Sequence, residues 1–271
     1  YKTIPGPSLT LTESTIFAGT DAKKGVPVQI ESVRGVHEVV IYRIENGSEV
    51  EALRETKNGE HTLNYAPEID FTEATSKLKV VVSDGREGKE AIGYMKAYVN
   101  MDVATLNVGS QPLANNAHVK YPDAFGMVSL NDLKTYSVDY AIANEVNAKN
   151  VDFKFYCFGA SGSPRLYSMD NTGKDGEFSG STGKLSAIKV KNLTRFAILS
   201  NFDYENATVA SISSEILSSS IAQSLLDPIA VGNVIAFRTG GSSAAGGGRI
   251  GVMKVINITC LLYTSPSPRD T

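Results

Sequence analysis

The sequence predicts a mainly β protein with two domains: an N-terminal β-sandwich, then a β-rich domain decorated with helices. Three observations lead to this. In the first hundred residues, apolar and polar residues alternate in short runs. Turn residues such as Asn46-Gly47 separate these runs, and no segment of helical periodicity interrupts them. From about residue 104, helical periodicity alternates with apolar strand-like segments, which is typical of an α+β or helix-decorated β domain.

The alternating runs of the first half predict about seven strands, the number expected of an immunoglobulin-like β-sandwich. The clearest run is 77–83, in which Leu78, Val80 and Val82 occupy every second position. This half contains no tryptophan and no cysteine, so we expect aliphatic packing alone to hold the two sheets together. The predicted strands are 9–11, 28–30, 37–44, 49–53, 63–65, 77–83 and 91–100.

The second half is predicted to contain two helices. The first covers 136–149, with Ser137 as its N-cap and one apolar stripe (Val138, Ala141, Ile142 and Val146). The second covers 214–226, where Leu217, Ile221 and Leu225 repeat every four residues and Asp227-Pro228 ends the helix.

Strands are predicted at 151–158, 195–200, 233–239 and 249–259. The last two should form a hairpin across the glycine-rich segment 240–248. A phosphate-binding loop would lead into the N-terminus of a helix, whereas this segment leads into a strand. We therefore interpret 240–248 as a flexible hairpin loop.

The domain organisation predicted from these elements is a linker at 1–7, the sandwich at 8–100 and the second domain at 104–259. The remaining segment, 260–271, has no hydrophobic period, and its residues from Cys260 to Asp270 resemble one translated reading frame of a transposase sequencing adapter. We expect it to be an artefact. Without it, Cys157 is the sole cysteine, which predicts a buried free thiol, no internal disulfide and no cysteine-based metal site.

Charge and hydropathy exclude two classes of function. The net charge of −3 leaves no basic stripe for a phosphate backbone, so nucleic acid is not an expected partner. No apolar run is long enough to span a bilayer as a helix.

Several short motifs of the first half carry a resemblance to a known family. They are Leu9-Thr-Leu11, the pattern Gly-x-Pro-Val-x-Ile at 25–30, and the hairpin from Asp84 to Gly88-Lys89 before the last strand. In residues 8–100 the chain resembles the N-terminal immunoglobulin-like domain of surface lipoproteins from gut Bacteroidota, the SusE/SusF-type starch-binding proteins. The second half contains the motifs Val-Asp-Phe-x-Phe-Tyr at 151–156, Val-Ile-Ala-Phe-Arg-Thr at 234–239 and Gly-Val-Met-Lys-Val at 251–255. In these motifs it is similar to C-terminal domains of other lipoproteins of this group, and the resemblance implies no activity for it.

The resemblance implies a location on the outer-membrane surface of a Gram-negative bacterium, with a lipid anchor on a cysteine upstream of Tyr1 as the only membrane contact. It also implies that the sandwich is a spacer and the second domain a recognition module, with glycan as a candidate ligand. Glycan binding requires exposed aromatic rings, and the chain has no tryptophan. Tyr167, Phe178 and Tyr204 lie among polar residues and are the candidate ligand-binding residues.

One acidic loop could hold a metal ion. Asp170, Asp175 and Glu177 offer the oxygen ligands that Ca²⁺ prefers. Lys174 interrupts the alternation that an EF-hand needs, so an ordinary solvated loop is the competing interpretation. No other cofactor is expected.

Three classes of function stay open at this point. The first is a non-catalytic surface lipoprotein that recognises glycan. The second is an adhesive or structural surface protein with a protein partner. The third is a hydrolase that uses Asp and Glu residues of the second half, but the sequence places no carboxylate pair at one site, and we expect no catalytic residue.

Overall fold

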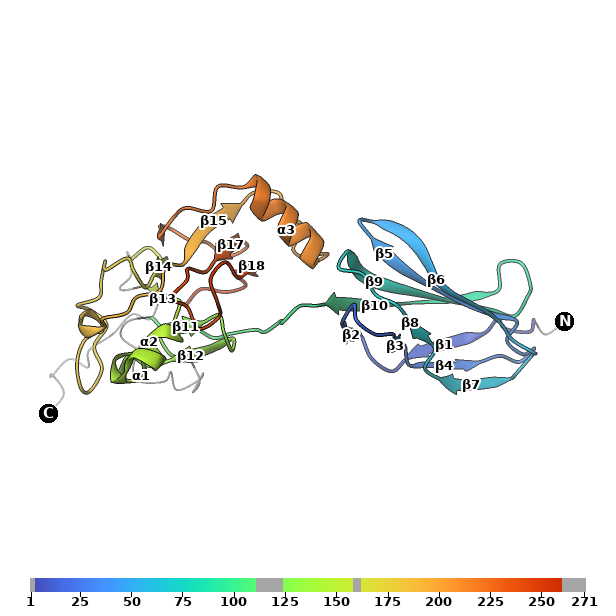
Figure 1. Cartoon of the computed structure of the whole chain (residues 1–271). Helices are drawn as coiled ribbons and strands as arrows, with labels where there is room; N and C mark the ends of the chain where they lie inside the picture. The colour runs from blue at the N-terminus through green and yellow to red at the C-terminus, as the bar shows by residue number, and fades with distance from the viewer. Residues whose placement is uncertain (1–2, 111–123, 158–161, 260–271) are drawn as a thin grey trace, which may run out of the picture. The chain divides into compact units, whose positions relative to one another are not determined.

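The computed structural model describes residues 3–110, 124–157 and 162–259. The chain is mainly β, as predicted, and it forms two compact units (Figure 1). The first unit comprises Tyr1–Asp102 with Glu205–Ser213, and the second comprises Val103–Tyr204 with Ser214–Thr271. No helix in the described ranges is long and apolar enough to cross a membrane.

The first unit is a β-sandwich. One sheet has the strand order β2-β10-β9-β5-β6 and the other has the order β1-β4-β7, with a small β3-β8 pair beside them (Figure 1). The strands are β1 (Ser8–Leu11), β2 (Thr15–Ala18), β3 (Lys24–Gly25), β4 (Val28–Glu31), β5 (Glu38–Glu45), β6 (Ser48–Thr56), β7 (Thr62–Tyr65), β8 (Glu68–Ile69), β9 (Thr75–Ser83) and β10 (Glu90–Val99).

Aliphatic side chains from both sheets make one core. Ile30 of β4, Ile41 of β5 and Leu78 of β9 are all completely buried in it. Each fully buried side chain of this size contributes about 1.5–3 kcal/mol relative to its exposed state. Every second residue of β9 and of the C-terminal half of β10 points into the core, which confirms the alternation seen in the sequence.

In the first unit, the sequence prediction missed three short strands, β2, β3 and β8. The reason is clearest for β2, which runs parallel to β10 at the edge of the larger sheet. Four residues with one buried position, Ile16, are too few to show a period of two. The pairing with β10 comes from packing between segments far apart in the chain.

The second unit contains a five-stranded sheet of order β12-β11-β13-β14-β16 and a three-stranded sheet of order β15-β17-β18. The elements after Asp102 are β11 (Met127–Ser129), β12 (Lys134–Tyr136), α1 (Val138–Ala143), α2 (Glu145–Lys149), β13 (Phe153–Tyr156), β14 (Arg165–Ser168), η2 (Leu185–Ala187), β15 (Arg195–Leu199), α3 (Val209–Ser218), β16 (Leu225–Leu226), β17 (Val234–Arg238) and β18 (Ile250–Lys254).

The first predicted helix is in fact two short helices, α1 and α2. Ser137 caps α1 as expected, since its Oγ accepts a hydrogen bond from the Tyr140 amide at 3.1 Å. Asn144 breaks the helix because its backbone is extended, and its side chain then caps α2 through the Asn147 amide. The predicted apolar stripe is wrong at Val146, which is 76% exposed.

The second predicted helix has the wrong bounds. The helix α3 begins at Val209, where the Thr208 side chain accepts a hydrogen bond from the Ser211 amide at 3.1 Å, and it ends at Ser218. Leu217 is therefore exposed, and Leu225 lies in the strand β16. The four-residue repeat of Leu217, Ile221 and Leu225 arises from segments of different conformation and not from one helical stripe.

The predicted hairpin between β17 and β18 is confirmed, since the two strands pair antiparallel. The loop that joins them is not a free glycine linker. Ser243 Oγ donates to Asp152 Oδ1 at 2.6 Å, and the Ala244 amide donates to the Lys149 carbonyl at 2.7 Å. These two bonds attach the loop to the segment before β13.

The prediction for Cys157 is only partly right. Its side chain is buried, as expected, but it is disulfide-bonded and not a free thiol. The expectation of a free thiol was wrong because it counted a single cysteine, whereas the full sequence has two. The segment 260–271, and with it the adapter interpretation, lies outside the described residues.

Candidate functional site

A row of large aromatic side chains lies on the outer face of the larger sheet in the first unit. On β10, core residues such as Met95 and Ala97 alternate with Tyr94 and Tyr98, which point to the opposite face. Tyr98 pairs with Phe17 of β2, and Tyr94 lies in register with Lys79 of β9 and then Tyr42 of β5. Residues directly opposite each other share a face of a sheet. We call Phe17, Tyr42, Tyr94 and Tyr98 the aromatic face.

Two members of the aromatic face are unusually open to solvent. Tyr94 is 58% exposed and Phe17 is 55% exposed. The ring of Phe17 stacks on that of Tyr98, with 5.3 Å between centroids and 28° between planes. Stacking fixes both rings in place, so Phe17 is held as an ordered platform although it is exposed.

Ammonium groups lie beside the rings. Lys96 Nζ is 5.3 Å from the centre of the Tyr98 ring, and Lys79 Nζ is 5.7 Å from that of Tyr42. Lys79 also donates a hydrogen bond to Glu49 at 2.8 Å, and this bond raises the pKa of Lys79. The aromatic face therefore combines apolar ring surfaces with charged hydrogen-bond donors.

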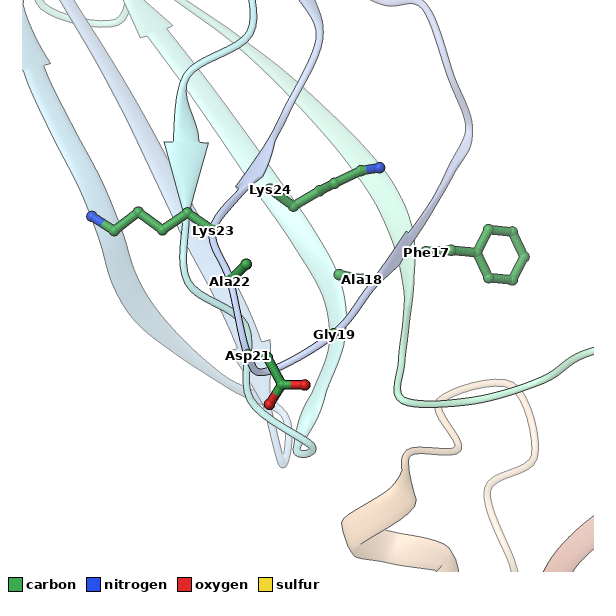
Figure 2. Close-up of a pocket in the computed structure, with 7 residues that line it drawn as sticks. All are labelled: Phe17, Ala18, Gly19, Asp21, Ala22, Lys23 and Lys24. Atoms are coloured by element: carbon green, nitrogen blue, oxygen red, sulfur yellow. The ribbon is translucent and has the colours of Figure 1, made fainter.

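A shallow hollow lies at one end of the aromatic face, in the loop after β2 (Figure 2). Figure 2 shows that the side chains of Phe17, Asp21 and Lys23 point in different directions rather than toward one point. A small-molecule site normally has polar groups that converge on the ligand. The hollow lacks that feature, so we assign the candidate site to the aromatic face. The residues that line the hollow are Phe17, Ala18, Gly19, Asp21, Ala22, Lys23 and Lys24.

The aromatic residues predicted in the second unit are placed differently. Tyr167 and Phe178 are 4% and 0% exposed, so the expectation that they form an open platform is wrong. Their polar sequence neighbours suggested exposure, but both rings belong to a hydrophobic core cluster and lie beside the ammonium group of Lys154. Tyr204 is half-buried, with Lys254 Nζ 5.6 Å from its ring centre.

Each carboxylate of the predicted calcium loop is paired with at least one basic side chain. Asp170 accepts two hydrogen bonds from Arg195, at 2.8 and 2.7 Å. Burial alone would raise the pKa of Asp170, but the bonds from Arg195 and Ser168 outweigh burial and lower it. Asp175 pairs with Lys154 and Lys191.

Glu177 completes that loop. It accepts from Lys174 at 2.7 Å and from the Tyr156 hydroxyl at 2.7 Å, and the bond from Lys174 contributes most to lowering its pKa. Within the described ranges, no three His, Cys, Asp or Glu side chains are grouped so that they could hold a metal ion. The three predicted ligands are thus committed to separate partners.

The most deeply buried carboxylate, Asp152, links three segments of the second unit. It accepts hydrogen bonds from the Leu130 amide at 2.7 Å, from Ser243 Oγ at 2.6 Å and from Asn192 Nδ2 at 3.2 Å. Burial is the largest influence on this group and raises the pKa of Asp152. Because all three partners are protein atoms, the arrangement joins loops and offers no vacant position for a ligand.

The aromatic face was not predicted from the sequence, although the alternation of residues along β10 indicates part of it. The run from Ile92 to Val99 alternates strictly, and the side opposite Met95 and Ala97 carries Tyr94 and Tyr98. What the run could not show is that β2 and β5 bring Phe17 and Tyr42 to the same face.

No protein-family model matches the chain, and no curated protein matches it either.

Proposed function

We propose that this chain is a non-catalytic binding protein of the bacterial cell surface, and that it binds glycan on the aromatic face of its first unit. The observation that carries the proposal is the exposure of Tyr94 and Phe17 on one sheet face. Exposed apolar surface that is gathered in one place usually marks an interaction site. The surface location is supported by the sequence resemblance of residues 8–100.

The chemistry of the aromatic face favours glycan over a protein partner. Aromatic rings offer large apolar area with few rotatable bonds, which suits stacking against the C–H face of a sugar ring. The ammonium groups of Lys79 and Lys96 lie beside the Tyr42 and Tyr98 rings and already donate to Glu49 and to the Glu205 carbonyl. Because an ammonium group has three donors, each lysine can also donate to a sugar hydroxyl. Protein–protein interfaces are depleted of lysine relative to the rest of the protein surface.

Glycan recognition would then lie in the first unit, and not in the second unit as the sequence predicted. Tyr167 and Phe178 are buried, and the carboxylates of the second unit form ion pairs and hydrogen bonds within the unit. Groups that are held in this way support a structural role for the second unit, and a non-catalytic function for the chain.

A glycan array on the full chain tests this function. For any glycan that binds, we expect Tyr94→Ala and Phe17→Ala each to weaken binding about five- to tenfold, since one aromatic contact contributes about 1–1.5 kcal/mol. Tyr204→Ala is the matched control, because this half-buried tyrosine of the second unit should not matter.

Two results would contradict the proposal. One is binding that Tyr204→Ala abolishes while Tyr94→Ala preserves it, which would return the site to the second unit. The other is a blank array together with a protein partner whose binding depends on Tyr94, which would favour the adhesive function.

A further inference from the structure

The second unit buries a lysine and an aspartate against each other. Lys154 of β13 is 0% exposed, Asp175 is 3% exposed, and Lys154 Nζ donates a hydrogen bond to Asp175 Oδ1. The two residues are far apart in sequence, and a turn closed by the Asp175 amide and the Thr172 carbonyl holds the aspartate in place. An amine and a carboxyl group are thus fixed in contact with no bulk solvent around them.

The surroundings of this pair are mostly apolar. The ring centres of Tyr167 and Phe178 lie 5.5 and 5.9 Å from Lys154 Nζ. The other polar contact of the amine is the Asn171 carbonyl at 2.8 Å. Removing two opposite charges from water is costly, and their mutual attraction repays the cost only in part. Any reaction that removes both charges is therefore favoured here more than in water.

A second lysine provides the acid that such a reaction needs. Lys191 Nζ pairs with Asp175 Oδ2 at 2.5 Å, and its side chain is 18% exposed, so it can exchange protons with solvent. Lys154 and Lys191 share the carboxylate of Asp175. Its single negative charge can balance the positive charge of only one of them. Burial is the largest influence on Lys154 and lowers its pKa, although the hydrogen bond to Asp175 opposes this. Burial thus favours the uncharged amine, which is the nucleophilic form, at the inner lysine.

We propose that Lys154 and Asp175 join in an intramolecular amide bond, with Lys191 as the proton donor. The uncharged Nζ of Lys154 attacks Cγ of Asp175, and the bond between Cγ and Oδ2 breaks. Lys191 protonates the departing oxygen, which takes a second proton from the attacking nitrogen and leaves as water. Lys191 then regains its proton from solvent. The overall change is an ammonium and a carboxylate converted into an amide and one water, without oxidation or reduction.

Intact-mass measurement on the full chain, reduced and denatured, tests the proposal. We expect the mass to be lower than that of the sequence by one water, and proteolysis should yield a branched peptide that joins residues 154 and 175. Lys154→Met and Asp175→Ala should both show the full mass of their sequences. Lys191→Met should form the bond about 10²–10⁴-fold more slowly, the usual contribution of one general acid.

One competing reaction gives the same mass. Asp175 precedes Gly176, and an Asp-Gly step can lose water by forming a cyclic imide with its own backbone. The imide would persist in Lys154→Met and give no branched peptide. A water deficit that survives in Lys154→Met overturns the proposal, as does a full mass for the wild-type chain after long incubation in its folded state.

Discussion

The cores of the two units are built in different ways. In the first unit, the buried residues are aliphatic or aromatic apart from a few hydroxyl side chains such as Thr75 and Ser76. In the second unit, Asp152, Lys154 and Asn192 are all completely buried beside the apolar clusters. This difference in buried polar side chains goes with a difference in strand length. The described strands have up to ten residues in the first unit and at most five in the second.

Strand length matters because long ladders satisfy the backbone by themselves. Where strands are short, loops enter the interior, and their amide and carbonyl groups need partners. Asp152 accepts from the Leu130 amide, Ser168 Oγ accepts from the Thr194 amide, and Asn192 Nδ2 donates to the Val151 carbonyl at 2.8 Å. Buried polar side chains in the second unit therefore replace the missing backbone ladder.

The largest effect should come from removing the Asp152 carboxylate. Asp152→Ala leaves the Leu130 amide and the Ser243 hydroxyl without their acceptor, whereas Asn192 keeps its bonds to two backbone carbonyls. Because each buried donor without a partner costs about 1–3 kcal/mol, we expect the second unit to lose about 3–5 kcal/mol of unfolding free energy. Chemical denaturation, followed by a signal specific to the second unit, measures the loss. Asp21→Ala, in an exposed loop of the first unit, is the control. A loss below about 1 kcal/mol would show that the polar network of the second unit does not replace the ladder.

A somewhat smaller effect is expected in the aliphatic core of the first unit. Leu78→Ala removes a completely buried side chain and should cost about 3 kcal/mol, by lost burial and by the cavity left behind. The same change at Leu217, which is 86% exposed, is a matched control with little expected effect. Equal losses at both positions, measured by urea denaturation, would mean that burial does not control stability in this chain.

The smallest effect concerns the pH dependence of the second unit. The pKa of Asp170 is lowered in the folded state. Its contribution to the unfolding free energy is therefore fully present above the unfolded pKa of about 3.9, and it is lost as pH falls through the folded pKa. Arg195→Met removes the strongest cause of this lowering. We expect the melting temperature of the second unit to fall less steeply with acid, below about pH 5, in Arg195→Met than in the wild type.

The matched control for that experiment is Arg54→Met. Arg54 pairs with Glu38 and Glu51 on the surface of the first unit, where solvent screens the charges. This variant should keep the wild-type dependence on pH. If it changed the acid slope as much as Arg195→Met does, the partial burial of the Asp170 pair would not explain the effect.

Local patterns were sufficient for the strands of the first half and for the hairpin of β17 and β18. In a strand with one buried face, buried and exposed residues must alternate, so β9 and β10 can be recognised in the sequence. The N-cap at Ser137 was also predictable, because a cap acts over three residues. The break at Asn144 was not, since the apolar spacing continues through it.

The mainly β class could thus be predicted from the sequence alone, as could the residues of the longest strands that face the core. Both depend on the pattern of neighbours within a few residues. The aromatic face depended on register between β2, β10, β9 and β5. The burial of Tyr167 and Phe178 depended on the hydrophobic cluster that they join in the second unit. Ser243 reaches Asp152 across 91 residues. Such contacts are selected by the packing of the whole domain, which no local period records.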